Sequence, residues 1–128
     1  MPNTNFDALV TVGAITAGGA ITGASVTATG GTTTGAAGTP ITQTRVYSQT
    51  ITPASVAAAT VAEQTFTVTG LTTADKVVVN PAAIANATGI AGVRVSATDT
   101  LAVRFVNPTA GALVPTAGTW TILAFRSA

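Results

Sequence analysis

The N-terminal third of the chain constrains the fold most, because it holds almost no material for a core of its own. No charged residue lies between Asp7 and Arg45, and the tetrapeptide Gly-Ala-Ile-Thr occurs twice, at Gly13–Thr16 and Gly19–Thr22. Large apolar side chains recur in this stretch at Leu9, Ile15 and Ile21, six residues apart, and then at Val26. Such a segment has too little apolar surface to fold alone, so it needs copies of itself or a partner surface.

The composition of the whole chain also indicates an assembled protein. The 128 residues include four Phe, one Trp, one Tyr and one Met, so the core consists mainly of Val and Ala and is thin for this length. Charged residues make up 7% of the chain, against about 25% in ordinary soluble domains. Because surface charge helps to keep monomers in solution, we expect this chain to hide much of its surface in oligomeric contacts.

The residue types exclude several classes of function. A net charge of +1 leaves no electrostatic footprint for nucleic acid. The chain has neither His nor Cys, which rules out Ser-His-Asp and Cys-His catalysis and the common zinc sites. Asp75 and Asp99 fall where Asp commonly stabilises turns. We therefore expect no enzyme, no cofactor and no metal site. No apolar run long enough to cross a bilayer and no secretory signal is evident, so we expect no membrane partner.

The chain divides near Arg45 into an arm, residues 1–44, and a compact unit, residues 45–128. The tract Gly30–Gly38 has the composition of a flexible linker. Two interpretations of the arm compete: a disordered low-complexity tail, or short β segments that wrap around identical segments or lie along a neighbour. The periodic Ile residues favour the second interpretation.

The second region alternates between apolar and polar residues and predicts six or seven short strands. The stretch Leu101–Val106 forms a hairpin with Gly92–Ser96 around the turn 97–100. The other predicted strands are Arg45–Thr52, Glu63–Thr69, Lys76–Asn80 and Thr119–Arg126. Turns every 8–12 residues predict an all-β fold, a small antiparallel β-sandwich of jelly-roll-like type preceded by an extended, β-rich arm.

Two groups of side chains in the predicted strands could be structural or functional. The default role of the aromatic residues Phe66, Phe105, Trp120 and Phe125 is core packing. Arg94 and Arg104 interrupt the two strands of the hairpin, so we expect both on one outer face of the sheet. They are either solvated strand charges or a basic contact to a partner subunit.

The stretch Asp75–Arg126 resembles a module in small structural proteins of tailed bacteriophages, namely capsid decoration (cement) proteins, head fibres and tail-fibre tips. The strings that carry the resemblance are Asp75–Pro81, Gly89–Ser96, Leu101–Thr109 and Trp120–Arg126. The resemblance covers about 50 residues well and the arm loosely, and it includes no catalytic motif. It implies a virion protein that forms a homotrimer with a β-sandwich head.

Between the roles that the resemblance allows, capsid decoration fits best. An arm of about 40 residues reaches at most ~130 Å when fully extended, enough to clamp adjacent capsid subunits but short for a fibre. We expect a trimer on the outer capsid surface that bridges and stabilises major capsid subunits, with Leu9, Ile15, Ile21 and Val26 at the capsid or trimer interface. The alternative is a receptor-binding knob or short tail or head fibre, and only this role would involve a host-surface glycan.

Overall fold

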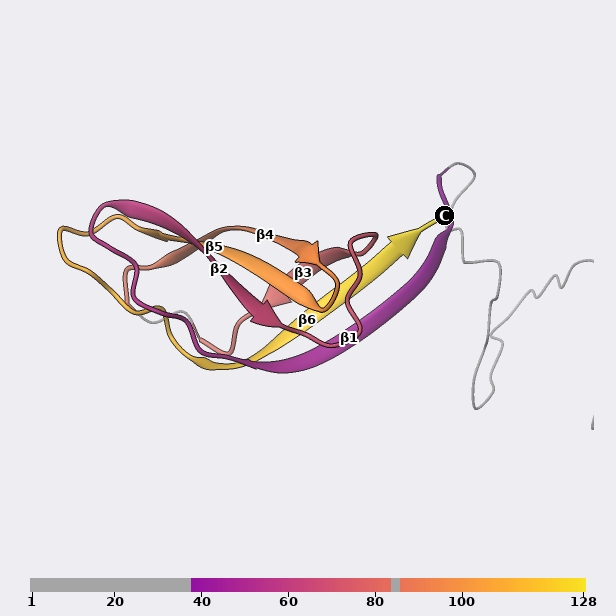
Figure 1. Ribbon diagram of the computed structural model, residues 1–128, viewed down its shortest axis with the longest axis horizontal. Helices are drawn as coiled ribbons and strands as arrows, with labels where there is room; N and C mark the ends of the chain where they lie inside the picture. Colours follow the sequence, from indigo (N-terminus) through magenta and orange to yellow (C-terminus); the bar gives the residue numbers. More distant parts are fainter. Residues whose placement is uncertain (1–37, 84–85) are drawn as a thin grey trace, which may run out of the picture.

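The computed structural model describes residues 38–83 and 86–128 and shows two antiparallel sheets of three strands each (Figure 1). The strands are β1 (Ile41–Ile51), β2 (Thr60–Thr67), β3 (Lys76–Asn80), β4 (Gly89–Ala97), β5 (Thr100–Asn107) and β6 (Gly118–Ser127). No helix occurs among the described residues. The predicted all-β sandwich is confirmed.

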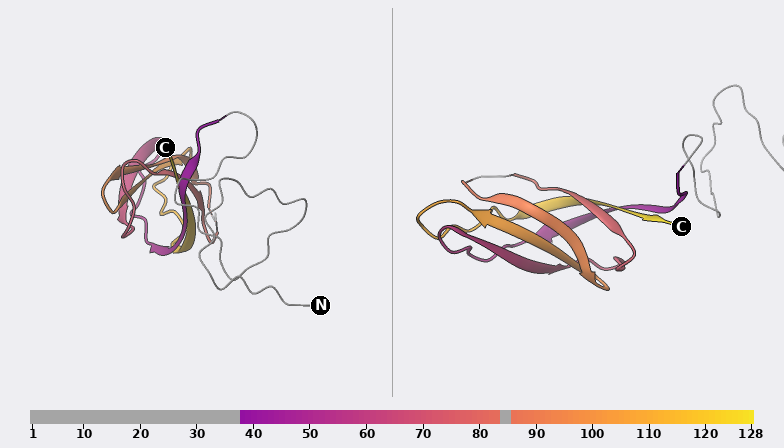
Figure 2. Two further views of the ribbon diagram at one scale, coloured as in Figure 1. Left: turned by 90° about the vertical axis from the view of Figure 1, so that its right-hand side faces the viewer. Right: turned by 90° about the horizontal axis from the view of Figure 1, so that it is seen from above.

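The outer strand pairs are nested, β1 with β6 and β2 with β5, whereas β3 pairs with β6 and not with β4. In one sheet the order is β1-β6-β3, and in the other it is β2-β5-β4. Thus β1 pairs with the last strand, β2 pairs with the strand before it, and only β4 and β5 form a hairpin within one sheet. This nested order is the jelly-roll-like arrangement, and Figure 2 shows the two layers from two further directions.

The core lies between the sheets and is organised around three aromatic rings. Phe105 and Trp120 are almost fully buried, and Phe66 packs against them. The ring centroids of Phe66 and Phe105 are 6.4 Å apart and those of Phe105 and Trp120 are 6.2 Å apart, both edge to face. Such pairs stabilise beyond their buried area. The core prediction is confirmed for these three residues.

The core prediction is wrong for Phe125. Along β6 the buried side chains are Trp120, Ile122 and Ala124, so the alternation of the strand turns Phe125 to the opposite, outer face, where it is half-buried. The aromatic side chain of Phe125 was expected in the core, but Phe125 is one residue away from the inward-facing Ala124 and therefore faces outward.

The head begins earlier than the sequence indicates. β1 starts at Ile41, so the sandwich includes residues 41–44, which the sequence places in the arm. Ile41 pairs with Ser127, which puts the start of β1 and the C-terminus at the same end of the molecule (Figure 1). The predicted interface residues Leu9, Ile15, Ile21 and Val26 lie outside the described residues.

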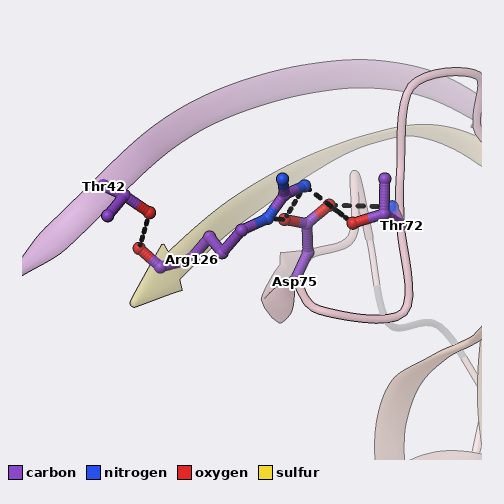
Figure 3. A network of polar contacts seen from close by, with 4 residues as sticks. All are labelled: Thr42, Thr72, Asp75 and Arg126. Atoms are coloured by element: carbon purple, nitrogen blue, oxygen red, sulfur yellow. Dashed lines mark hydrogen bonds and ion pairs between the residues drawn. The ribbon is translucent and has the colours of Figure 1, made fainter. Parts of the chain in front are cut away.

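The acidic residues Asp75 and Asp99 stabilise turns. Asp75 lies in the turn between β2 and β3, and its Oδ2 accepts a hydrogen bond from the Thr72 amide at 2.8 Å. Its Oδ1 forms an ion pair with Arg126 of β6 at 2.8 Å (Figure 3). Asp99 Oδ1 accepts a hydrogen bond from the Gly70 amide at 2.6 Å, which joins the β4–β5 turn to the β2–β3 connection.

Candidate interaction surfaces

The outer face of the β1-β6-β3 sheet carries an uncovered apolar row across its three strands. Val46 of β1 pairs with Leu123 of β6, which pairs on its other side with Val78 of β3. These side chains are 68%, 39% and 56% exposed, respectively. We call Val46, Leu123 and Val78 the apolar row.

The surroundings of the apolar row are almost uncharged. Two residues along β6 from Leu123, on the same face, Phe125 lies between Thr44 and Lys76, and two residues the other way Thr121 lies between Ser48 and Asn80. Lys76 is the single charged residue in these three rows, and none of them contains a carboxylate. A sheet face with apolar residues at its centre and hydroxyl and amide groups around them is typical of a surface buried in an assembly.

The outer face of the other sheet carries a charged pair. Arg94 of β4 donates to Glu63 of β2 through Nη2 to Oε1 at 2.7 Å and through Nε to Oε2 at 3.4 Å, so it contacts both carboxylate oxygens. The pair spans the central strand β5. Ala102, which pairs with Arg94 on this outward side, is only 1% exposed. The two long side chains thus cover the middle of the sheet.

Beside this pair lies a shallow hollow of about 200 Å³, lined by Glu63, Ala91, Gly92, Val93, Arg94, Ala102 and Arg104. Arg104 stands directly opposite Glu63 on one side and Gly92 on the other. Because Gly92 has no side chain, the space beside Arg104 stays open, and a Cβ at Gly92 would meet no atom within 4 Å. The prediction that Arg94 and Arg104 share one outer face is confirmed.

The two arginines nevertheless differ in their bonding. Arg94 is held by Glu63, whereas the guanidinium of Arg104 has no hydrogen bond or ion pair within the described part of the chain. The hydrogen bond from Arg94 lowers the pKa of the Glu63 carboxyl, and the positive charges of Arg94 and Arg104 act in the same direction. Glu63 is therefore ionised at neutral pH, and the hollow carries two positive charges against one negative charge.

The loops at the end opposite the C-terminus and the start of β1 are tied together. Val56 and Leu113 exchange two backbone hydrogen bonds, of 2.8 and 3.0 Å, which join the β1–β2 and β5–β6 connections. Asn86 of the β3–β4 connection donates to the Val114 carbonyl at 3.1 Å. Fully buried Asn107 donates to the carbonyls of Val56, Ala57 and Gly111. We call this end the loop tip.

The described acidic side chains are spread over the head, and each is engaged in hydrogen bonds. Within residues 38–83 and 86–128, no group of three or more His, Cys, Asp or Glu side chains could hold a metal ion. Three of the four acidic residues are described, and Glu63, Asp75 and Asp99 accept hydrogen bonds from Arg94, Arg126 and Gly70, respectively. In the same ranges, no helix has the length and apolar character needed to span a bilayer.

The sequence reasoning missed the apolar row and the buried Asn107. A signal for the row is present, because the runs Val77–Val79 and Ile122–Leu123 place apolar residues on both faces of a strand. Asn107 was assigned only to the end of a strand. A single Asn gives no sign that it bonds two carbonyls of the distant β1–β2 connection as well as that of Gly111 in its own loop.

Comparisons with known proteins leave the chain without a family assignment: no protein-family model, curated protein or solved structure matches it.

Proposed function

We propose that this chain is a non-enzymatic virion structural protein, a homotrimeric decoration protein on the outer surface of a tailed-phage capsid. In this role it bridges neighbouring major capsid subunits and stabilises the assembled shell. The observation that carries the proposal is the apolar row, an uncovered apolar strip at the centre of a sheet face that is almost free of charge.

The occupant that we assign to this face is a second copy of the chain. β1 and β6 pair over ten register positions, or about 34 Å, whereas β3 pairs with β6 over only five, or about 17 Å. With strands about 4.8 Å apart, the face is about 400 Å² in projection, about half of the roughly 800 Å² per partner of a stable interface. A second contribution is needed, and the arm joins the head at Ile41, the first residue of the edge strand of this same sheet.

The assignment to a phage capsid comes from the resemblance of the strings in Asp75–Arg126, which correspond to β3, β4, β5 and β6. The arm carries no charge after Asp7 and suits attachment, because such a segment can lie along a protein surface and add strand hydrogen bonds there. The partners are thus the chain itself and the major capsid protein.

Two measurements on the full chain test the proposal. Light scattering at low micromolar concentration should give three times the chain mass of 12.5 kDa; a stable, folded monomer would refute the trimer. Undecorated capsids should bind the protein, and the double variant Ile15→Asp/Ile21→Asp should lose binding while its head keeps its β-sheet circular dichroism spectrum. If that variant decorates capsids as well as the parent does, the arm is not the anchor.

The loop tip supports a second candidate, a receptor-binding knob. The tip lies at the end away from the C-terminus and the start of β1 (Figure 1), is held in shape by Asn107, and exposes Val114 by 53%. A knob attached through its arm would present this end to the host surface, and a host glycan would be its ligand. Particles that lack the protein would then adsorb poorly to the host, whereas decoration predicts normal adsorption and a lower temperature of capsid disruption.

A further inference from the structure

The hollow on the β2-β5-β4 sheet has one positive charge that its own residues do not neutralise. Arg94 satisfies both oxygens of Glu63, at 2.7 and 3.4 Å. The guanidinium of Arg104, opposite Glu63 on the central strand, is left with unused donors in the described part of the chain. The net charge of these three side chains is +1, from 2 − 1.

The shape of the hollow favours a small, flat anion. Gly92 leaves the strand surface low beside Arg104, and the Arg94–Glu63 pair, which covers Ala102, borders the hollow. A guanidinium binds a carboxylate through two parallel N–H···O bonds, and one carboxylate has the single negative charge that neutralises the hollow.

We infer that the hollow beside Arg104 and Gly92 binds one carboxylate group, supplied by an Asp or Glu side chain of a partner protein. Among the described residues that line the hollow there is no aromatic ring, so this lining lacks the stacking surface that an acidic sugar would use. Its volume of about 200 Å³ is also below that of ordinary small-molecule pockets. That the partner is a capsid subunit rests on the proposed function; the carboxylate site does not.

The proposal gives Arg94 and Glu63 opposite effects on binding. Glu63 stands opposite Arg104 and could pair with it in place of an incoming carboxylate. Arg94 limits this competition because it holds Glu63 in its own ion pair. Glu63→Gln should therefore strengthen carboxylate binding. Arg94→Gln should weaken it although Arg104 is still present, because the released Glu63 then pairs with Arg104 across the strands.

The test is an NMR titration of the full chain with acetate, which follows the Nε–H signals of the arginines and the amide of Gly92. Acetamide is the neutral control, and sodium chloride keeps the ionic strength constant. Acetate should produce saturable shifts at Arg104 and Gly92, and acetamide should not. Arg45, an exposed arginine on the edge strand β1, should not respond.

Variants test whether the acetate-induced NMR shifts arise from binding in the hollow. Arg104→Gln should abolish the shift at Gly92, and the matched control Arg45→Gln should leave it unchanged. Gly92→Val fills open space on a strand and should weaken acetate binding by about fivefold or more while the amide spectrum of the core is preserved. Shifts of equal size at Arg45 and Arg104, or no shift at Arg104, would overturn the site.

A second pair of probes tests the kind of partner. Glutamate blocked at both backbone ends should bind at least as tightly as acetate, and glucuronate should bind no more tightly. Tighter binding of glucuronate would overturn the assignment to a protein side chain. Loss of the trimer or of capsid attachment in the earlier tests would not change either titration, so the two proposals fail separately.

Discussion

Replacing the apolar row should dissociate the trimer without unfolding the head. The double variant Val46→Thr/Val78→Thr removes two outward methyl groups and keeps side-chain shape and β-propensity. Both side chains point away from the core, with exposures of 68% and 56%, so the isolated head loses little packing. The expected effect is therefore confined to association.

The magnitude follows from these exposed fractions. Full burial of a Val side chain contributes about 1.5–3 kcal/mol. Scaled by exposure, burial in the trimer contributes about 1–2 kcal/mol at Val46 and about 1–1.5 kcal/mol at Val78. Thr keeps one methyl group but adds a hydroxyl whose unpaired burial costs a similar amount, so the double variant should lose about 2–3.5 kcal/mol per protomer. This loss corresponds to roughly 30- to 300-fold in the association constant per protomer.

Sedimentation equilibrium over a range of protein concentrations measures this change. The control is Val61→Thr, since Val61 is 54% exposed on the outer side of β2 and belongs to the other sheet. The control should associate like the parent, and circular dichroism should show the same strand content in all three proteins. If the double variant associates as tightly as the parent, the apolar row is not the trimer interface.

Three further predictions concern the stability of the head. Asp75→Asn should cost about 1–3 kcal/mol in urea unfolding at pH 7. Burial opposes ionisation of Asp75, but hydrogen bonds from Thr72 and Arg126 outweigh it and lower the pKa of this carboxyl. The stabilisation by Asp75 should therefore hold above about pH 4 and disappear as the pH falls through its folded-state pKa. If the variant showed the same pH dependence of stability as the parent, this explanation would be contradicted. Asn107→Ala removes a buried side chain that donates to three carbonyls and accepts from the Thr109 amide; each carbonyl keeps one other donor but the Thr109 amide loses its acceptor, so the change should cost about 1–3 kcal/mol in the same assay, and an unchanged urea midpoint would show that the loop tip does not depend on it. Gly70→Ala should cost about 1–3 kcal/mol, because Gly70 has a φ of +100° and a Cβ there would lie 3.2 Å from the Tyr47 hydroxyl oxygen; a neutral result would show that this turn relaxes.

The fold could be predicted from the sequence because polar and apolar residues alternate regularly and prolines and glycines bound the strands. Lys76–Asn80 was predicted with its observed bounds, and the β4–β5 hairpin within a few residues. The pairing of β1 with β6 could not be predicted, since it joins residues about 80 positions apart and no local signal records a partner so distant.

The candidate surfaces were only partly predictable. The shared face of Arg94 and Arg104 follows from their register in a hairpin, which is local. Which of the two arginines forms an ion pair does not follow from the hairpin, because the partner carboxylate, Glu63, lies on β2, a strand outside the hairpin. The apolar row likewise requires three strands to align Val46, Leu123 and Val78. Phe125 was predicted in the core because it is aromatic, although its position in the alternation of the strand places it on the outer face.

The location of the protein on a purified phage particle tests the central claim most directly. Electron microscopy with an antibody against the β-sandwich head, applied to intact particles, shows where the chain is exposed. Decoration of the capsid predicts label distributed over the outer surface of the shell and none on the tail. Label confined to the tail or its fibres would contradict capsid decoration and favour the receptor-binding knob.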